Sequence, residues 1–156
     1  MKKPGTKNIA SNRKATHDYF LFDSYEAGIV LQGTEIKSIR AGRVSLREAY
    51  VHIEAKEAWL LNAHIAPYDP ASRFNHSPKR PRKLLLHKGE ISKLQDQIRQ
   101  RGYTIIPTRM YFKRGRVKLE IALARGKRKY DKRRTIAKRD AQREIDRSIS
   151  KRNRQR

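Results

Sequence analysis

Residues 117–123 read Val-Lys-Leu-Glu-Ile-Ala-Leu and place a large apolar side chain at every second position. Alternation with a period of two is typical of a β-strand that buries one face and turns the other to solvent. The preceding segments, 103–106 and 108–113, are rich in β-branched and aromatic residues and are also predicted to be strands. The last strands of the fold are therefore expected between residues 103 and 123.

Further strands are predicted toward the N-terminus. Runs of aromatic and β-branched residues at 19–22 and 29–31 suit buried strands. Residues 50–53 and 58–61 carry similar apolar residues, and the polar segment 55–57 between them is predicted to be a hairpin turn. Two paired strands are expected there.

Two short helices interrupt this pattern. Residues 34–41 have helical spacing, with Thr34 as the expected cap and Gly42 as the expected end. A helix of about fourteen residues is predicted after the 83–86 segment, with Gly102 as its stop. Its apolar face is formed by Ile91, Leu94 and Ile98.

Many short strands with one or two short helices favour a small antiparallel barrel, closed or nearly closed. The fold class is therefore predicted to be mainly β, an OB-fold-like barrel over residues 1–124. Residues 1–12 are polar and are expected to form a flexible arm, and the proline-containing segment 67–81 a long irregular loop. Residues 125–156 are predicted to be a separate basic tail.

The tail holds 15 Lys or Arg against four acids. Such a segment buries too little apolar surface to offset its ordering entropy, so it is predicted to be disordered when free. Ala137, Ala141, Ile145 and Ile149 recur every four residues, whereas Arg139 and Arg143 place like charges at the same spacing. A helix in this tail is therefore expected to form where phosphates surround it.

Positive charge is spread over the whole chain, because the other 124 residues hold 24 Lys or Arg against 11 acids. Neutralisation of many phosphates explains this distribution better than a basic localisation tag does. The chain has no cysteine, long apolar run or amphipathic helix of the kind that anchors proteins to lipid. A cytoplasmic RNA-binding protein with no membrane partner is expected.

Signals for catalysis, metals and cofactors are weak. The five histidines show no metal-ligand spacing, and the sequence contains neither a phosphate-cradling glycine loop nor a Gly-x-Ser-x-Gly motif. His17 and Asp18 are neighbours, which would face opposite sides of a strand. Asp23 with Glu26 is more consistent with two solvated acids than with a metal site. No cofactor is expected, and the protein is not expected to be an enzyme.

Two clusters could contact RNA. Tyr111 and Phe112 precede a turn carrying Lys113, Arg114 and Arg116, which would combine a stacking surface with phosphate-binding charge. An ordinary hairpin with a solvated basic turn is the equal alternative. The cations within 79–83 pose the same choice between an RNA-facing loop and a merely soluble one.

Longer stretches resemble a known family. They are 9–19 (Ile-Ala-Ser-Asn-Arg-Lys-Ala-Thr-His-Asp-Tyr), 26–40 with Gly-Thr-Glu-Ile-Lys-Ser at 33–38, 82–87, and 118–133 with Tyr-Asp-Lys-Arg at 130–133. In this order and over nearly the full length, they resemble the small protein B family, which binds transfer-messenger RNA (tmRNA, or SsrA RNA) in bacterial trans-translation.

The resemblance implies a non-catalytic adaptor that holds the tRNA-like domain of tmRNA, supports its charging with alanine and delivers it to stalled ribosomes. Implied partners are tmRNA and the ribosome, with alanyl-tRNA synthetase and elongation factor Tu acting indirectly, and a monomer is expected. The tail would enter the empty mRNA channel, beside the decoding centre and small-subunit ribosomal RNA, and fold there as a helix.

Site residues carry over by position. Asn12, Glu26, Leu85 and Lys118 resemble the family's surface for the tRNA-like domain, although core packing of Leu85 is an equal alternative. The ribosome-binding tail would comprise Gly126, Lys127, Tyr130, Asp131, Lys132, Arg133, Lys138 and Arg139. Many relatives have histidine where this chain has Tyr130, so a stacking role is expected there in place of one that needs a protonatable ring.

Other functions fit parts of this pattern. A structural ribosomal protein would also carry a basic extension, and a general RNA chaperone would also be strongly basic. A nuclease is the enzymatic alternative, but the sequence lacks an obvious carboxylate cluster.

Overall fold

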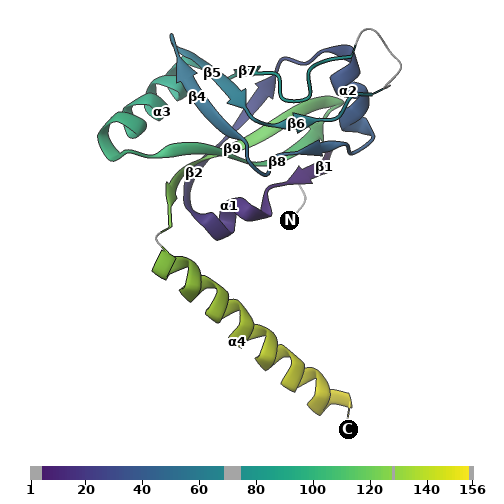
Figure 1. Ribbon diagram of the computed structural model, residues 1–156, viewed down its shortest axis with the longest axis vertical. Coiled ribbons are helices and arrows are strands. Elements are labelled where there is room, and N and C mark those ends of the chain that lie inside the picture. Colours follow the sequence, from purple (N-terminus) through teal and green to yellow (C-terminus); the bar gives the residue numbers. More distant parts are fainter. Residues whose placement is uncertain (1–4, 69–74, 128, 155–156) are drawn as a thin grey trace.

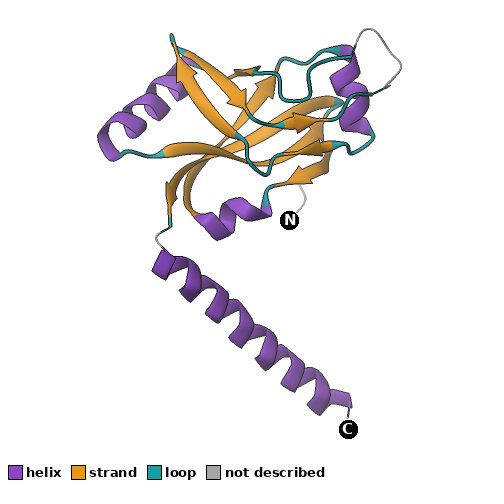
Figure 2. Ribbon diagram, in the orientation of Figure 1, coloured by secondary structure: helices purple, strands orange, loops and turns teal. Residues whose placement is uncertain are grey.

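The computed structural model describes residues 5–68, 75–127 and 129–154. The strands are β1 (Thr6–Ser11), β2 (Tyr19–Ile29), β3 (Val44–Ser45), β4 (Tyr50–Glu54), β5 (Glu57–Leu61), β6 (His64–Ile65), β7 (Arg82–Leu85), β8 (Thr104–Lys113) and β9 (Arg116–Gly126). The helices are α1 (Arg13–Asp18), α2 (Gly33–Arg40), α3 (Lys88–Arg101) and α4 (Lys129–Arg154). The mainly β fold class is confirmed (Figures 1 and 2).

The sheet curls into an antiparallel barrel. Strand pairing runs β8-β4-β5-β7-β2-β9, and β9 pairs again with β8, while β1 adds to the edge of β8. Two of these seams are short, because β4 pairs with β8 through Val51 and Ile105 alone, and β2 meets β7 at Gly28 and Ile29. The barrel is therefore OB-like without being strictly closed.

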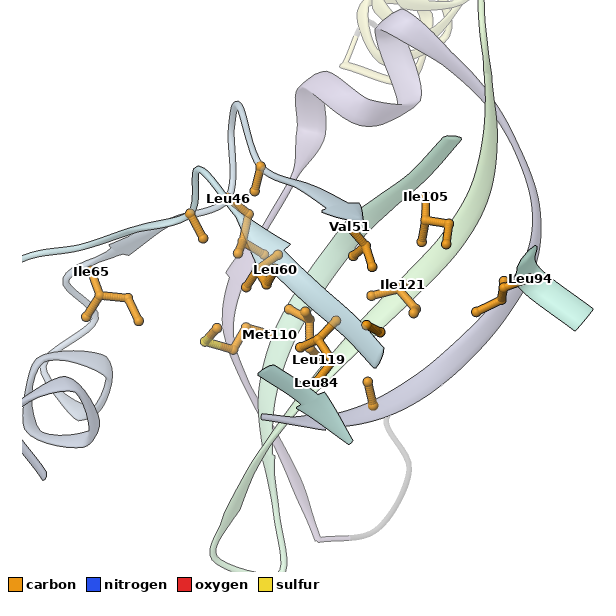
Figure 3. Packing of buried hydrophobic residues seen from close by; sticks show 14 of the residues in the cluster. Leu46, Val51, Leu60, Ile65, Leu84, Leu94, Ile105, Met110, Leu119 and Ile121 are labelled. Carbon is orange, nitrogen blue, oxygen red and sulfur yellow. The ribbon is translucent and has the colours of Figure 1, made fainter. Parts of the chain in front are cut away.

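The alternating stretch in β9 supplies the middle of the core. Leu119 and Ile121 are fully buried and pack with residues of the opposite wall such as Leu60 and Leu84 (Figure 3). Burying each of these side chains contributes about 1.5–3 kcal/mol of hydrophobic free energy. Beyond Ile121 the alternation of burial ends, because Ala122 and Ala124 are buried as well. Ala124 belongs to a second small cluster with residues of α1 and β8.

Several local predictions are confirmed. The β4–β5 hairpin turns at Ala55 and Lys56, whose φ angles are 50° and 61°. Helix α3 spans fourteen residues and ends at Gly102, which has a left-handed φ of 66°. Residues 75–81 lack helix and strand, as expected of the 67–81 loop, of which 69–74 lie outside the described residues.

Other predictions were wrong. Part of the expected flexible arm, Thr6–Ser11, forms strand β1, because its backbone pairs with β8. Instead of two strands at 19–22 and 29–31, one long strand, β2, runs from Tyr19 to Ile29, and residues 30–31 lie outside it. Helix α2 is capped by Gln32 and not by the expected Thr34. The backbone amide of Gln32 donates to the Glu35 carboxylate. Helix α1 was not predicted.

The last described element is one long helix, α4, which Figure 1 shows projecting away from the barrel beyond β9. The side chains at 136–150 are exposed, including those of Ile145 and Ile149. The structure thus shows the helical form of the tail. Disorder in the free protein stays a prediction.

Candidate nucleic-acid interface

Glu26 on β2 is held by two residues of β8. The Tyr111 hydroxyl donates to its Oε2, and Lys113 Nζ lies 3.2 and 3.3 Å from the two carboxylate oxygens. The hydrogen bond from Tyr111 is the largest cause of a lowered Glu26 pKa, and Lys113 and Lys118 lower it further. The ionised carboxylate is therefore fixed in place, yet its side chain is 37% exposed and retains capacity to accept hydrogen bonds.

This arrangement corrects one sequence interpretation. Tyr111 is only 3% exposed, so it does not provide the stacking surface that was one of our two interpretations of this segment. Burial and its hydrogen bond to Glu26 raise the pKa of Tyr111 well above its usual value. Phe112 is half-buried and packs against the core. The role of Tyr111 is to hold Glu26.

Cations surround this carboxylate. The β8–β9 turn, at Arg114 and Gly115 with φ angles of 51° and 75°, places the basic residues of the turn around a hollow that contains Glu26. That hollow is lined by Glu26, Lys113, Arg114, Arg116 and Lys118. One acid among four cations leaves an excess of positive charge, which suits a phosphate backbone.

A second hollow of about 600 Å³ adjoins the first and shares Glu26 and Lys118 with it. Leu85 of β7 lines it and is 55% exposed, which excludes the core-packing alternative for this side chain. Leu85 lies opposite Gly28 of β2, where an added Cβ would come within 3.2 Å of the Leu85 Cβ. We call these two hollows together the Glu26 groove.

Asn12 lies elsewhere. It is 6% exposed, its Nδ2 donates to the carbonyls of Leu46 at 3.1 Å and Pro107 at 2.9 Å, and its Oδ1 accepts from the Ala15 amide. The side chain therefore caps α1 and ties it to two distant segments. These bonds give Asn12 a structural role, and a direct contact with RNA stays a prediction.

The RNA-facing interpretation of the 79–83 cations was wrong for Arg82. This side chain is fully buried, forms an ion pair with Glu35 and donates to the Ala63 carbonyl at 2.9 Å. Arg80 contacts the same carboxylate. Burial raises the Glu35 pKa, but hydrogen bonds from Arg80, the Gln32 amide and Arg82 outweigh it, so the net pKa is lowered. Lys83, by contrast, lines the Glu26 groove.

His17 and Asp18 also differ from expectation. They lie at the end of α1 instead of on a strand, and His17 Nδ1 is 2.7 Å from Asp18 Oδ1. The opposite-face argument failed because α1 was not predicted. Among the described residues, no group of three or more His, Cys, Asp or Glu side chains is placed to hold a metal ion.

Lys127 joins the tail to the barrel, just after β9 ends at Gly126. Its amide donates to the Asp18 carbonyl at 2.8 Å, and its Nζ donates to the Thr16 carbonyl at 3.0 Å. These bonds attach the start of the tail to the end of α1. In α4, the side chains of Tyr130, Asp131, Lys132 and Arg133 lie outside the described residues, and Lys138 and Arg139 are exposed.

A small, strongly basic barrel with a fixed carboxylate in a cationic groove and a basic helical extension defines a class of RNA-binding protein. No helix in the described ranges is long and apolar enough to cross a membrane. The model of the SmpB protein family matches residues 9–151, so this chain belongs to the SmpB family.

Relatives and a solved structure agree with this assignment. The SsrA-binding protein of Desulforudis audaxviator is 53% identical over 95% of this chain and 97% of its own length. The SsrA-binding protein of Symbiobacterium thermophilum is 58% identical over 90% of this chain and 90% of its own length. A chain in a structure described as "tmRNA-SmpB: a journey to the center of the bacterial ribosome" has a TM-score of 0.66 and 44% identity, and the match covers 81% of this chain and 93% of that chain.

Proposed function

We propose that this protein binds the tRNA-like domain of tmRNA and takes part in trans-translation on stalled ribosomes. The observation that carries the proposal is the Glu26 groove, in which a carboxylate is held ionised by Tyr111 and Lys113 beside an exposed leucine. A purely electrostatic RNA surface gains nothing from such an acid. A fixed acceptor is useful where it meets an exocyclic amine or a 2′-hydroxyl of a particular RNA fold.

Each residue of the groove has a distinct role in this proposal. Glu26 accepts hydrogen bonds, Leu85 packs on an unstacked base, and Lys118 pairs with a phosphate. The turn cations Lys113, Arg114 and Arg116 add further phosphate contacts. Asn12 contributes by holding α1 in place against the barrel.

The tail has a separate role in the proposal. Residues 125–156 form a functional unit of their own, which enters the empty mRNA channel and is stabilised as a helix by ribosomal RNA phosphates. Support comes from the exposed, cation-rich α4, in which like charges four residues apart need counter-charges around them. Lys132, Arg133, Lys138 and Arg139 supply phosphate contacts, and Tyr130 stacks.

The protein acts as a monomeric adaptor without chemistry of its own. In this proposal it supports alanine charging by holding the tRNA-like domain, so that alanyl-tRNA synthetase and elongation factor Tu are indirect partners. Incubating labelled RNA with the protein and Mg²⁺ tests this directly, since cleavage would favour the nuclease alternative.

A binding competition tests the central claim. The full chain is offered a tmRNA tRNA-like domain, an elongator tRNA and a single-stranded RNA of equal length at about 150 mM salt. A preference of about a hundredfold for the tRNA-like domain is expected if the groove recognises one RNA fold. Near-equal binding of the three RNAs would favour the chaperone alternative. Stoichiometric association with ribosomes that does not depend on stalling would favour the structural ribosomal protein.

A further inference from the structure

An aromatic pair, Phe22 of β2 and Tyr103 just before β8, lies outside the set of residues that line the Glu26 groove. Phe22 is 43% exposed, and its ring stacks on that of Tyr103 with centroids 4.9 Å apart and planes inclined by 14°. Tyr103 is half-buried and packs against the hydrophobic core. One ring therefore supports the other, and the exposed Phe22 ring is held in a fixed orientation.

The backbone directs Phe22 outward. Pairing of β2 with β9 jumps from Leu21 opposite Ala124 to Ser24 opposite Ala122, so Phe22 lies in a β-bulge. Bulges re-aim side chains and often occur next to functional sites. The preceding residue, Leu21, packs inward against the small cluster around Ala124. The core therefore gains Leu21 from this segment and leaves Phe22 at the surface.

A second ring with two cations lies two residues away. The Arg125 guanidinium is 5.1 Å and the Lys127 ammonium 5.2 Å from the centroid of the Phe20 ring. Arg125 lies directly opposite Phe20 in the β2–β9 register and is exposed. The acid Asp23 lies on the other side of Phe22 in the sequence. Charge thus favours a phosphate on the Phe20 side of the aromatic pair.

An exposed ring beside Arg and Lys can bind an unpaired base, because the base stacks on the ring while the cations meet the backbone. We propose that Phe22 and Tyr103, with Phe20, Arg125 and Lys127, form a second RNA site that takes an unpaired base of a single-stranded segment. We call it the Phe22 site. Phe22 and Glu26 are four positions apart along β2, which is about 13 Å, and the site is independent of the Glu26 groove.

Binding of a fluorescent ten-nucleotide oligoadenylate to the full chain tests the proposal. Phe22→Leu keeps an apolar side chain but removes the ring, so affinity is expected to fall at least about fivefold with an unchanged salt dependence. The matched control is Tyr68→Leu, which removes a 46% exposed ring that lies 5.3 Å from the Lys37 ammonium. The control is expected to bind the oligonucleotide like the unaltered protein.

Two further measurements separate this proposal from the function of the groove. Phe22→Leu is expected to bind the tRNA-like domain normally and to melt at the temperature of the unaltered protein. A single-stranded RNA containing 4-thiouridine is expected to crosslink to Phe22 or Tyr103. Unchanged oligoadenylate affinity, or crosslinks confined to the tail and the groove, would overturn the Phe22 site and leave the proposed tRNA-like domain binding untouched.

Discussion

The Glu26 groove and the α4 tail are both basic, but they are built in opposite ways. In the groove, the Glu26 carboxylate of β2 is held by Tyr111 and Lys113 of β8, and side chains of β7 and β9 line the same hollows. In α4, the side chains at 136–150 are exposed. We therefore infer that the groove is organised before RNA arrives and can select a shape, whereas the tail is expected to depend on its surroundings for order and to contribute charge and length.

Removal of the tail is expected to have the largest effect of the variants that test this contrast. Deleting residues 126–156 is expected to leave cooperative melting and tRNA-like domain binding largely intact, because the barrel core ends at Ala124. Tagging of a stalled nascent chain in a reconstituted translation system is expected to be abolished. Loss of cooperative melting would show that the tail is part of the fold and would remove the division into two regions.

Glu26→Arg tests whether the groove selects by shape or by charge. The substitution adds two positive charges, so a purely electrostatic surface would bind more tightly. We expect affinity for the tRNA-like domain to fall at least about tenfold, which corresponds to about 1.4 kcal/mol, because the fixed acceptor is lost. Binding is measured by filter retention or anisotropy.

Glu57→Arg is the matched control for that variant. Glu57 also lines the groove and pairs with Lys83 at 3.2 Å, and both side chains are more than 40% exposed. The same charge change there is expected to leave binding equal or slightly tighter. If both variants bind more tightly, the groove has no specific use for its carboxylate.

Gly28→Ala tests the position of Leu85. The new Cβ would meet the Leu85 Cβ at 3.2 Å, so Leu85 must shift by a few tenths of an ångström. We expect tRNA-like domain affinity to fall about threefold to tenfold, with single-stranded RNA binding unchanged. The control is Gly89→Ala in α3, where an added Cβ has no neighbour within 4 Å. Equal affinities of the two variants would argue against a contact by Leu85.

The consequence of a methyl group at Gly28 could not be foreseen from sequence, because it depends on the pairing of β2 with β7. Signals that lie within one segment were sufficient for β9, for α3 with Gly102, and for the β4–β5 turn. Strand β1 was missed because its polar sequence is strand only through pairing with β8. Helix α1 was missed because Asn12 caps it and also bonds to carbonyls 34 and 95 residues away.

The candidate site shows the same division. Family resemblance pointed to Glu26, Leu85 and Lys118, and the structure brings these three together. The role of Tyr111 could not be predicted, because its partner Glu26 is 85 residues away in sequence. Arg82 looked like a solvated cation for a similar reason, since its partner Glu35 lies 47 residues away. Long-range pairing decides which charged residues face solvent.

Lys127→Met tests the junction between the two regions. The variant keeps an apolar stem but removes the ammonium that bonds to the Thr16 carbonyl, so the start of the tail is held less firmly against α1. Rescue is expected to fall several-fold while tRNA-like domain affinity stays unchanged. Lys138→Met removes the same charge from the exposed surface of α4 and is expected to have a smaller effect. Equal losses of rescue activity in the two variants would mean that Lys127 acts through its charge alone.

The smallest expected effect concerns pH and the hydrogen bond from Tyr111 to Glu26. Because this bond is the largest cause of the lowered Glu26 pKa, Tyr111→Phe is expected to raise that pKa toward its ordinary value of about 4.5. A carboxyl whose pKa is lowered by folding stabilises the folded state above its unfolded pKa, and this contribution is lost as the pH falls through the folded pKa. In the unaltered protein, both that stabilisation and the acceptor function of Glu26 therefore persist to a lower pH than in the variant.

We expect the acid limb of tRNA-like domain binding to lie at higher pH in Tyr111→Phe, with similar affinity at neutral pH. Titrations of binding from neutral to mildly acidic pH would show this displacement, and superimposable acid limbs would mean that Tyr111 does not prepare the carboxylate for RNA.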